Sequence, residues 1–334
     1  MLAIGGNSLI RLKGRSSFAD QLATVAETCR PIADLVEVGH QVVVTHGNGP
    51  QVGFLLIRSH LSRNRLSEIP LDACNAITQA EIGYMIQQAL DNEFSLRGIR
   101  KGVVTVVTQV VVDKEDPAFR SPSKPVGPFY TKGEAGLLQR DSGWNMSEDS
   151  GRGFRRLVPS PRPVEIVEQE QIAGLLDAGS VVVACGGGGI PVIRQDGGLR
   201  GVAAVIDKDL TSSLLARRIG AQVLVMSTGV EHVYLDYGRK NQQPLGNVRT
   251  QEMREYLSAG QFAAGSMGPK VEAALEFLES DEVRNQNSDT RNQKPKAGRG
   301  IQTTDDGVQR AVVITDPEHI TQAMRGEAGT RITE

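Results

Sequence analysis

Short apolar runs alternate with amphipathic helical patterns along most of the 334-residue chain. The runs are rich in β-branched residues, and they predict strands just before Gly5 and within 41–47, 102–113, 180–187, 221–229 and 311–315. Helical spacing recurs between them, in Ala73, Ala76, Ile77, Ala80 and Tyr84, in Leu210, Leu214 and Leu215, and in Val271, Ala274, Leu275 and Leu278. Strands of nearly continuous Val and Ile that alternate with such helices predict a largely parallel sheet, covered on both faces.

Glycine-rich turns follow four of the predicted strands. They are Gly5-Gly6-Asn7, Gly47-Asn48-Gly49, Gly186 to Gly189, and Thr228-Gly229. Ligands of parallel sheets bind beyond the carboxyl ends of the strands, and backbone N–H groups at such turns can face an anion. The turns therefore predict a phosphate site, with tight turns alone as the alternative interpretation. The chain has no GxxxxGK[ST] loop, and GGGGIPV does not fit the GxGxxG pattern of dinucleotide sites.

Two segments interrupt the alternation within what we expect to be a single domain over residues 1–334. Residues 114–163 are rich in Pro, Gly, Ser and charge, which predicts an excursion from the sheet, in the form of a small protruding lid. Residues 281–310 contain very few aliphatic side chains, so burial cannot offset the entropy of ordering them. We expect this second segment to be a flexible surface loop without a catalytic role.

Composition narrows the class of partner. A net charge of −2 gives no overall field that would recruit nucleic acid or a membrane, so small molecules are the expected partners. No apolar run reaches the roughly 18 to 20 residues of a membrane span, and no targeting segment is recognisable, which favours a soluble cytoplasmic protein. The three cysteines lack a CxxC pair and the five histidines lack HxxxH spacing, so we expect no metal-ligand set. His46, beside a glycine turn, is expected to make local hydrogen bonds.

Two lysines occupy unusual positions at predicted helix starts. Lys208 precedes the apolar stripe that begins at Leu210, and Lys270 follows Pro269 in the first turn of the next helix. A cation there is disfavoured by roughly 0.3–1 kcal/mol, because the positive end of the helix dipole lies at the N-terminus. A phosphate chain between the two helix starts would remove this penalty. The alternative is that each lysine extends into solvent. Asp209 is placed to orient Lys208, whereas Asp207 is a natural N-cap.

Lys124 lies in a proline-rich segment rather than at a predicted helix start. Pro125 follows it and biases its backbone to an extended conformation, and further prolines stiffen the surrounding SPSKPVGPF segment. A lysine on a rigid extended arm can reach over a site. A solvated loop lysine is the alternative interpretation.

A series of motifs resembles the carbamate kinases of the amino-acid kinase family. In order and near the family spacing, the chain contains GGNSL, HGNGPQVG, TQVVVD, SKPVGPF, GRGFRRLVPSP, GGGGIPV, AVIDKDL and AGSMGPK. The likeness runs from residue 1 to about residue 280 and resumes in the final strand and helix. It implies a three-layer α/β/α sandwich around a mainly parallel eight-stranded sheet, usually in a homodimer. The implied reaction is reversible phosphoryl transfer from carbamoyl phosphate to Mg-ADP, which yields ATP and carbamate.

The resemblance also implies roles for particular residues. The carbamoyl and transferred phosphoryl groups would be surrounded by Gly5, Gly6, Asn7, Gly47, Asn48 and Gly49. Lys124 would close over the carbamoyl phosphate, Lys208 and Lys270 would hold phosphates, and Asp209 would organise these lysines. The nucleotide would lie near Gly187, Gly188, Thr228, Gly229, Val230, Tyr237, Gly238 and Met267. The cofactor would be Mg²⁺, held mainly by nucleotide phosphates and water.

Three functions stay open at this point. The first is a carbamate kinase that generates ATP in the degradation of arginine or of a carbamoylated purine product. The second keeps the fold and changes the acceptor to another small carboxylate or a phosphonate, and Lys124 speaks against it. The third is a nucleotide-binding sensor without turnover, and the retention of Lys124, Lys208, Lys270 and Asp209 speaks against that.

Overall fold

The computed structural model describes residues 1–6, 9–10, 17–149, 151–263, 265–279 and 310–334. Its largest element is an eight-stranded sheet with the order β15-β17-β16-β12-β1-β2-β9-β3. These strands are β1 (Leu2–Ile4), β2 (Val43–His46), β3 (Val103–Thr105), β9 (Val181–Val183), β12 (Val223–Ser227), β15 (Asn247–Arg249), β16 (Ala311–Thr315) and β17 (Thr330–Thr333). Neighbouring strands run parallel except β16 and β17. The predicted mainly parallel sheet is confirmed.

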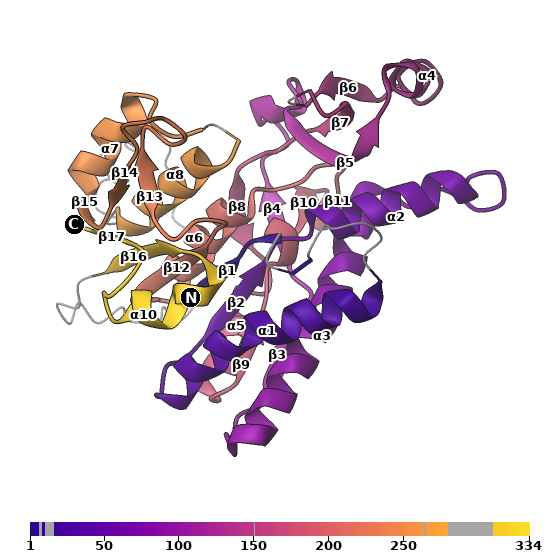
Figure 1. Cartoon of the computed structure of the whole chain (residues 1–334). Helices are drawn as coiled ribbons and strands as arrows, with labels where there is room; N and C mark the ends of the chain where they lie inside the picture. Colours follow the sequence, from indigo (N-terminus) through magenta and orange to yellow (C-terminus); the bar gives the residue numbers. More distant parts are fainter. Residues whose placement is uncertain (7–8, 11–16, 150, 264, 280–309) are drawn as a thin grey trace.

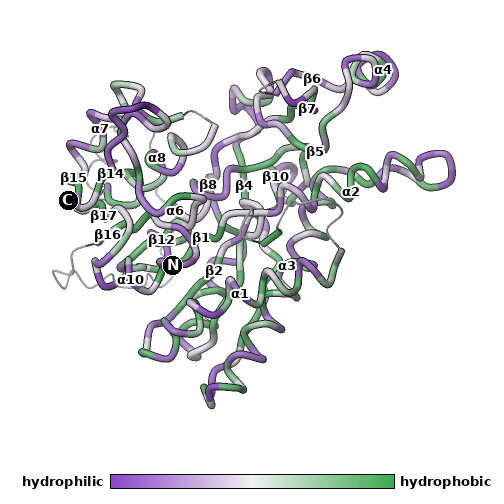
Figure 2. The backbone as a smooth tube through the Cα atoms, viewed as in Figure 1, coloured by the Kyte–Doolittle hydropathy of each residue, from purple (hydrophilic) through white to green (hydrophobic). Residues whose placement is uncertain are grey.

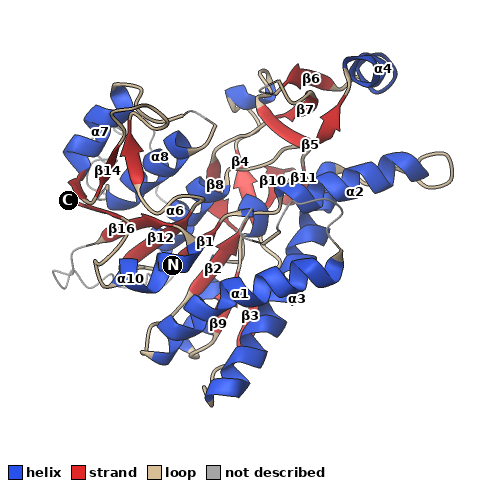
Figure 3. Cartoon of the chain, in the orientation of Figure 1, coloured by secondary structure: helices blue, strands red, loops and turns tan. Residues whose placement is uncertain are grey.

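Helices cover both faces of this sheet (Figure 3). The helices are α1 (Phe18–Glu37), α3 (Leu71–Arg97) and α10 (Ile320–Met324) on one face, and α5 (Gln169–Asp177), α6 (Lys208–Arg218), α7 (Thr250–Ser258) and α8 (Met267–Leu278) on the other. Leu2 and Ile4 of β1 are buried with side chains of α1 and α3, whereas Ala3 is buried with side chains of α8. This alternation along a strand buried on both faces confirms the three-layer sandwich. Within the described residues, no helix is both long and apolar enough to cross a membrane.

The order of the strands brings the four glycine turns together. The turns follow β1, β2, β9 and β12, and these strands are adjacent in the order β12-β1-β2-β9. All three of the pairs are parallel, so their carboxyl ends meet at one edge of the sheet. The four glycine turns therefore lie together at this edge, which is where parallel sheets bind their ligands.

The single strand predicted within 102–113 is wrong, because the segment forms two strands in different sheets. β3 stays in the main sheet, whereas β4 (Gln109–Val112) joins a second sheet of order β11-β10-β4-β8. The other strands of that sheet are β8 (Pro163–Ile166), β10 (Ile190–Gln195) and β11 (Gly198–Gly201). Between β3 and β4, the Gln79 side chain accepts a hydrogen bond from Thr108 N (2.8 Å) and donates one to Thr108 O (3.1 Å). A side chain thus takes the place of a strand partner and ends the ladder.

The predicted helix around Ala73–Tyr84 is confirmed as α3, but the residues that indicated it lie mostly on its outer side. Ile77 and Tyr84 are 43% and 52% exposed. The buried stripe instead includes Asn75, Thr78 and Gln79, followed by apolar residues farther along the helix. Turns of α3 alternate between hydrophobic and hydrophilic colours in Figure 2. Inward hydrogen bonds satisfy the three polar side chains, so their burial carries no unpaired polar group.

The elements between residues 117 and 158, within the segment predicted to leave the sheet, form a small unit at the upper right of Figure 1, beside α2 (Gly49–Ser62). It comprises η2 (Pro117–Phe119), β5 (Lys124–Tyr130), α4 (Lys132–Ser142), β6 (Asn145–Glu148) and β7 (Phe154–Val158), and its sheet has the order β5-β7-β6. Val52 and Leu56 of α2 are buried against Val126 and Val158 of this unit. We call these residues the protruding unit.

The remaining elements are short. β13 (Val233–Leu235) and β14 (Gln243–Leu245) form an antiparallel pair, and η3 (Gly186–Gly188) and η4 (Pro317–His319) are single helical turns. The flexible loop predicted over 281–310 falls outside the described residues, apart from Arg310.

The burial pattern of α3 predicts that truncating two of its leucines has very different effects on the free energy of unfolding. Leu90 is fully buried and Leu96 is 83% exposed. We expect Leu90→Ala to lower the free energy of unfolding by about 2–5 kcal/mol, because it leaves a cavity in the core. Leu96→Ala, the matched control, should change it by about 0.5 kcal/mol or less. Urea denaturation followed by circular dichroism measures both, and equal effects would contradict the orientation of α3.

Candidate active site

A cavity of about 1040 Å³ lies at the edge of the sheet where the glycine turns meet. Gly5 and Gly6 follow β1, Gly47 to Gly49 follow β2, Gly187 follows β9, and Thr228 and Gly229 follow β12. Lys124 reaches the same cavity from β5 of the protruding unit. The structure therefore brings the predicted turns and the predicted lysine arm to one site.

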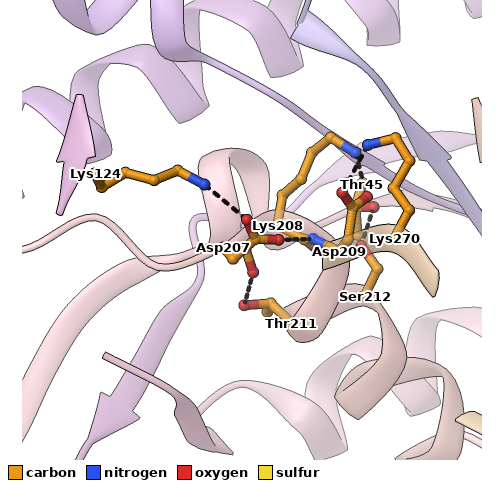
Figure 4. Close-up of polar contacts among 8 residues, drawn as sticks. All are labelled: Thr45, Lys124, Asp207, Lys208, Asp209, Thr211, Ser212 and Lys270. Atoms are coloured by element: carbon orange, nitrogen blue, oxygen red, sulfur yellow. Dashed lines mark hydrogen bonds and ion pairs between the residues drawn. The ribbon is translucent and has the colours of Figure 1, made fainter. Parts of the chain in front are cut away.

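Lys208 and Lys270 converge on one carboxylate inside this cavity (Figure 4). Lys208 Nζ lies 2.6 Å from Asp209 Oδ1, and Lys270 Nζ lies 2.8 Å from Asp209 Oδ2. Lys208 begins α6 and Lys270 lies in the first turn of α8, so the two helix starts face each other across Asp209. Both oxygens of Asp209 are thereby held by ammonium groups, as Figure 4 shows.

Burial sets the electrostatics of this cluster. Burial alone would raise the pKa of Asp209, but the neighbouring Lys208 and Lys270 outweigh it and hold that pKa well below its ordinary value. Burial lowers the pKa of Lys208, as does the charge of Lys270, while Asp209 opposes both effects. Asp209 is therefore ionised at neutral pH. Two lysines around one aspartate leave a net positive charge, which suits a bound phosphate.

Hydrogen bonds fix the first turn of α6, which carries Lys208. Asp207 is the N-cap, and its Oδ1 accepts from Asp209 N at 2.9 Å, as expected for a capping residue. Ser212 Oγ donates to Lys208 O (2.6 Å) and shares a 2.7 Å hydrogen bond with Thr45 Oγ1 of β2. These contacts tie the helix start to the central sheet (Figure 4).

Lys124 forms an ion pair that the sequence did not indicate. Its Nζ lies 2.7 Å from Asp207 Oδ2 (Figure 4). The Asp207 side chain is 14% exposed and that of Lys124 is 38% exposed. One carboxylate therefore caps α6 with one oxygen and holds the lysine of the protruding unit with the other.

Polar side chains of α3 hold the turns after β2 and β9 by hydrogen bonds. Asn48 Nδ2 donates to Thr78 Oγ1 (2.9 Å) and to Asn75 Oδ1 (3.2 Å), and Gln79 Nε2 donates to Gly186 O (3.0 Å). A Cβ atom on Gly187 would lie 2.1 Å from Asn48 Nδ2, so only glycine fits against this side chain. These contacts fix the side chain of Asn48 and the backbone after β9.

The turns after β1 and β2 approach each other closely. A Cβ atom on Gly47 would lie 2.7 Å from Gly6 N, which explains the need for glycine there. The N-terminus of α2 begins at Gly49, and its N-cap Asn48 makes no side-chain capping hydrogen bond. Because the Asn48 side chain turns towards α3 instead, it does not cap the N–H groups of Gly49 and Gln51 at the start of α2, and a helix N-terminus of this kind suits an anion.

Most of the predicted site residues line the cavity. They are Gly5, Gly6, Gly47, Asn48, Gly49, Lys124, Gly187, Lys208, Asp209, Thr228, Gly229, Val230, Tyr237, Met267 and Lys270. Gly188 is not among the lining residues, because its backbone packs against Ile206 and its carbonyl accepts from Thr211 Oγ1. Gly238 lies in an exposed turn, where its N–H donates to Gln242 Oε1 (2.7 Å). Asn7 lies outside the described residues.

The sequence reasoning missed Asn75, Thr78 and Gln79, which orient the turns, and the ion pair of Asp207. A signal for the first three was present, because they continue a stripe that is apolar farther along α3, at Ile82 and beyond. Polar residues in an otherwise apolar stripe indicate buried hydrogen bonds. The Asp207 pair had no local signal, since its partner is 83 residues away along the chain.

His46 ends β2 just below the cavity and is 1% exposed. Its Nδ1 lies 3.1 Å from Gly47 O, a local contact of the kind expected. Burial lowers its pKa to about 4, and the charge of Lys208 acts in the same direction. His46 is therefore neutral at pH 7.

Comparison with known proteins matches this chain and its fold to one family. The model of the amino acid kinase family matches residues 2–284. Carbamate kinase of Pyrococcus furiosus is 48% identical over 281 residues, covering 84% of this chain and 90% of the relative, and that of Pyrococcus horikoshii is 42% identical over 335 residues, covering 100% and 98%. The structure of carbamate kinase from Giardia lamblia bound to AMP-PNP is 37% identical, with a TM-score of 0.85 over 99% of this chain and 97% of the other. The chain therefore belongs to the amino acid kinase family and, within it, to the carbamate kinases.

The buried His46 predicts a pH-dependent loss of stability. The unfolded chain binds a proton at His46 near pH 6.5, whereas the folded chain does so only near pH 4. Stability therefore falls as the pH drops through this window, by about 3 kcal/mol in total. His46→Gln should remove this contribution, while His40→Gln, at an exposed position, should retain it. Urea denaturation between pH 4 and 7 measures the difference, and identical pH slopes for the two variants would contradict the prediction.

Proposed function

We propose that the protein catalyses the reversible transfer of a phosphoryl group between carbamoyl phosphate and ADP, giving carbamate and ATP. The observation that carries the proposal is the convergence of Lys124, Lys208 and Lys270 on one glycine-lined cavity. The family membership supports it, since relatives named carbamate kinase match the whole length of the chain.

Phosphoryl transfer through a loose transition state requires positioning and neutralised charge more than covalent chemistry. The bond between phosphorus and the carbamoyl oxygen breaks, and a bond between phosphorus and a terminal oxygen of ADP forms. Lys208 and Lys270 hold the negative oxygens during this exchange, and the N–H groups at Gly49 and the neighbouring turns donate to them. Asp209 keeps the two lysines at a fixed separation by its paired contacts. Lys124 covers the carbamoyl side from the protruding unit.

The lining of the cavity supports a nucleotide side beyond β12. Thr228, Gly229 and Val230 follow β12, Tyr237 lies in the turn after β13, and Met267 begins α8. This half also contains Tyr234, whose ring lies 5.9 Å from that of Tyr237. The aromatic and apolar side chains suit a nucleoside, whereas the phosphates extend towards Lys208 and Lys270.

Mg²⁺ fits the site as an ion brought by the nucleotide. The described residues contain no group of three or more His, Cys, Asp and Glu side chains arranged to hold a metal. The two carboxylates beside the lysines, Asp207 and Asp209, are already engaged by ammonium groups. Mg²⁺ commonly binds through substrate phosphates and water, and when bound it neutralises phosphate charge. The protein residues would then bind the phosphates rather than the metal.

The cellular setting is part of the same proposal. We place the enzyme in the cytoplasm, and its free, buried cysteines Cys29, Cys74 and Cys185 suit a reducing compartment. The degradation of arginine or of a carbamoylated purine product would supply its carbamoyl phosphate, and the enzyme would use it to form ATP. Its partners would be these small molecules, without nucleic acid or membrane.

The reaction predicts a specific effect of the lysine arm. Wild-type protein should form ATP from ADP, Mg²⁺ and carbamoyl phosphate, and Lys124→Ala should lower kcat/KM for carbamoyl phosphate by roughly 100-fold or more. Lys132→Ala, which removes an exposed lysine from the same unit, is the control and should retain wild-type activity. A coupled luciferase assay measures the ATP. ADP binding without turnover in the wild type would favour a sensor, and full activity of Lys124→Ala would refute the role of the arm.

A homodimer completes the proposal. Phe18, Tyr84 and Val107 are large apolar residues, each 45–52% exposed, and Phe18 stacks on Tyr84 with a ring distance of 6.4 Å. They lie on or beside α3, next to β3, which is the edge strand of the main sheet. Contact with a second copy would bury this surface and cover the edge.

Sedimentation velocity tests the dimer. The wild type should sediment at twice the chain mass, and Tyr84→Lys should shift it towards the monomer by placing a charge in the apolar contact. Leu61→Lys, at an exposed position of α2 away from β3, should leave the mass unchanged. A monomeric wild type at working concentration would refute the dimer.

A further inference from the structure

The ion pair between Lys124 and Asp207 places a hydrogen-bond donor and an acceptor side by side in the cavity. The two atoms are 2.7 Å apart, and both residues line the cavity. We propose that Asp207 determines the specificity for the carbamoyl group by accepting a hydrogen bond from its amino group. This inference rests on the proposed phosphoryl transfer from carbamoyl phosphate.

The pair keeps free hydrogen-bonding capacity while it is formed. An ammonium group has three donors, and each carboxylate oxygen accepts more than one hydrogen bond. Asp207 Oδ1 accepts from Asp209 N, whereas Oδ2 accepts from Lys124 Nζ (Figure 4). A substrate can therefore bind beside the pair without breaking it.

The carbamoyl group has the complementary pattern. Its carbonyl oxygen accepts and its amino group donates, and both are attached to one carbon atom. The carbonyl oxygen would face Lys124 Nζ, and an amino N–H would face Asp207 Oδ2. An acyl phosphate with a methyl group in place of the amino group keeps the contact with Lys124 and loses the one with Asp207. The desolvated Asp207 Oδ2 then lacks the hydrogen bond that the amino group would donate.

The other polar side chains near this part of the cavity are less suited to the task. Both oxygens of Asp209 are held by Lys208 and Lys270, and Asp209 is 4% exposed. Asn48 is held on α3 through its amide nitrogen, and its neutral amide oxygen is a weaker acceptor than a carboxylate. Asp207 is the carboxylate that lies directly against the lysine of the protruding unit, so it meets the group that this lysine covers.

Two variants separate recognition from the capping role of Asp207. Serine and asparagine are both strong N-caps, so Asp207→Ser and Asp207→Asn retain the start of α6. Serine is too short to keep a second acceptor beside Lys124, and asparagine removes the negative charge at almost unchanged shape. ADP binding by calorimetry verifies that each variant retains its nucleotide site.

The measurement is kcat/KM for ATP formation with carbamoyl phosphate and, separately, with acetyl phosphate, whose methyl group cannot donate. We expect both variants to lose roughly 10- to 100-fold with carbamoyl phosphate, because a hydrogen bond to a charged acceptor is lost. With acetyl phosphate, kcat/KM should change by no more than about 3-fold. The preference of the enzyme for carbamoyl phosphate over acetyl phosphate should therefore be largely lost. Lys124→Ala is the contrasting variant, and it should weaken both substrates to a similar extent.

The outcomes are distinguishable. Equal losses with both acyl phosphates would show that Asp207 only positions Lys124 or α6, and they would overturn the inference while leaving the proposed function intact. Unchanged kinetics of both variants would overturn it as well. If the wild type forms no ATP from carbamoyl phosphate, the proposed function itself fails, and the inference fails with it.

Discussion

The site depends on a single buried carboxylate that lies between two ammonium groups. Lys208 and Lys270 come from the starts of two helices, where the helix dipole disfavours a cation, and their side chains are only 14% and 13% exposed. Asp209 makes this arrangement stable, because its charge offsets both lysines at hydrogen-bonding distance. One positive charge remains uncompensated in the cluster. That surplus is what a phosphate ligand can use, so the same contacts stabilise the free protein and prepare it for its substrate.

The sheet and the helices place this cluster by simple means. Four adjacent parallel strands end at one edge, and each is followed by a turn that keeps backbone N–H groups close to the cavity. The approach of Gly47 to Gly6 and of Gly187 to Asn48 leaves no room for larger side chains. Buried amide and hydroxyl groups of α3 then hold Asn48 and the backbone of Gly186 by hydrogen bonds. The cavity is thus defined by backbone geometry and completed by few charged groups.

Sequence reasoning reached the sheet, the site and most of its lining because these depend on local patterns. Apolar strands, glycine turns and lysines at helix starts are visible within short windows, and the motif resemblance assigned their roles. It failed where a distant contact overrides the local pattern. Residues 102–113 have the composition of one strand, but Gln79 of α3 holds the backbone of Thr108 and separates two. Ile77 and Tyr84, which indicate α3, lie on its exposed side, because its buried side carries Asn75 and Thr78, whose partner Asn48 is about 30 residues away along the chain. The partner of Lys124, Asp207, belongs to the same class of long-range contact.

The contact between α2 and the protruding unit has a mechanical consequence. A Cβ atom on Gly53 would lie 3.3 Å from the Cα atom of Gly127, so helix and strand meet backbone to backbone. The first turn of α2 lines the cavity through Gly49, and its next turns pack against the unit that bears Lys124. Gly49 and Lys124, which line the same cavity, are therefore both held by α2. A larger residue at Gly53 would separate the two backbones and shift Lys124 relative to Gly49, although it touches neither residue.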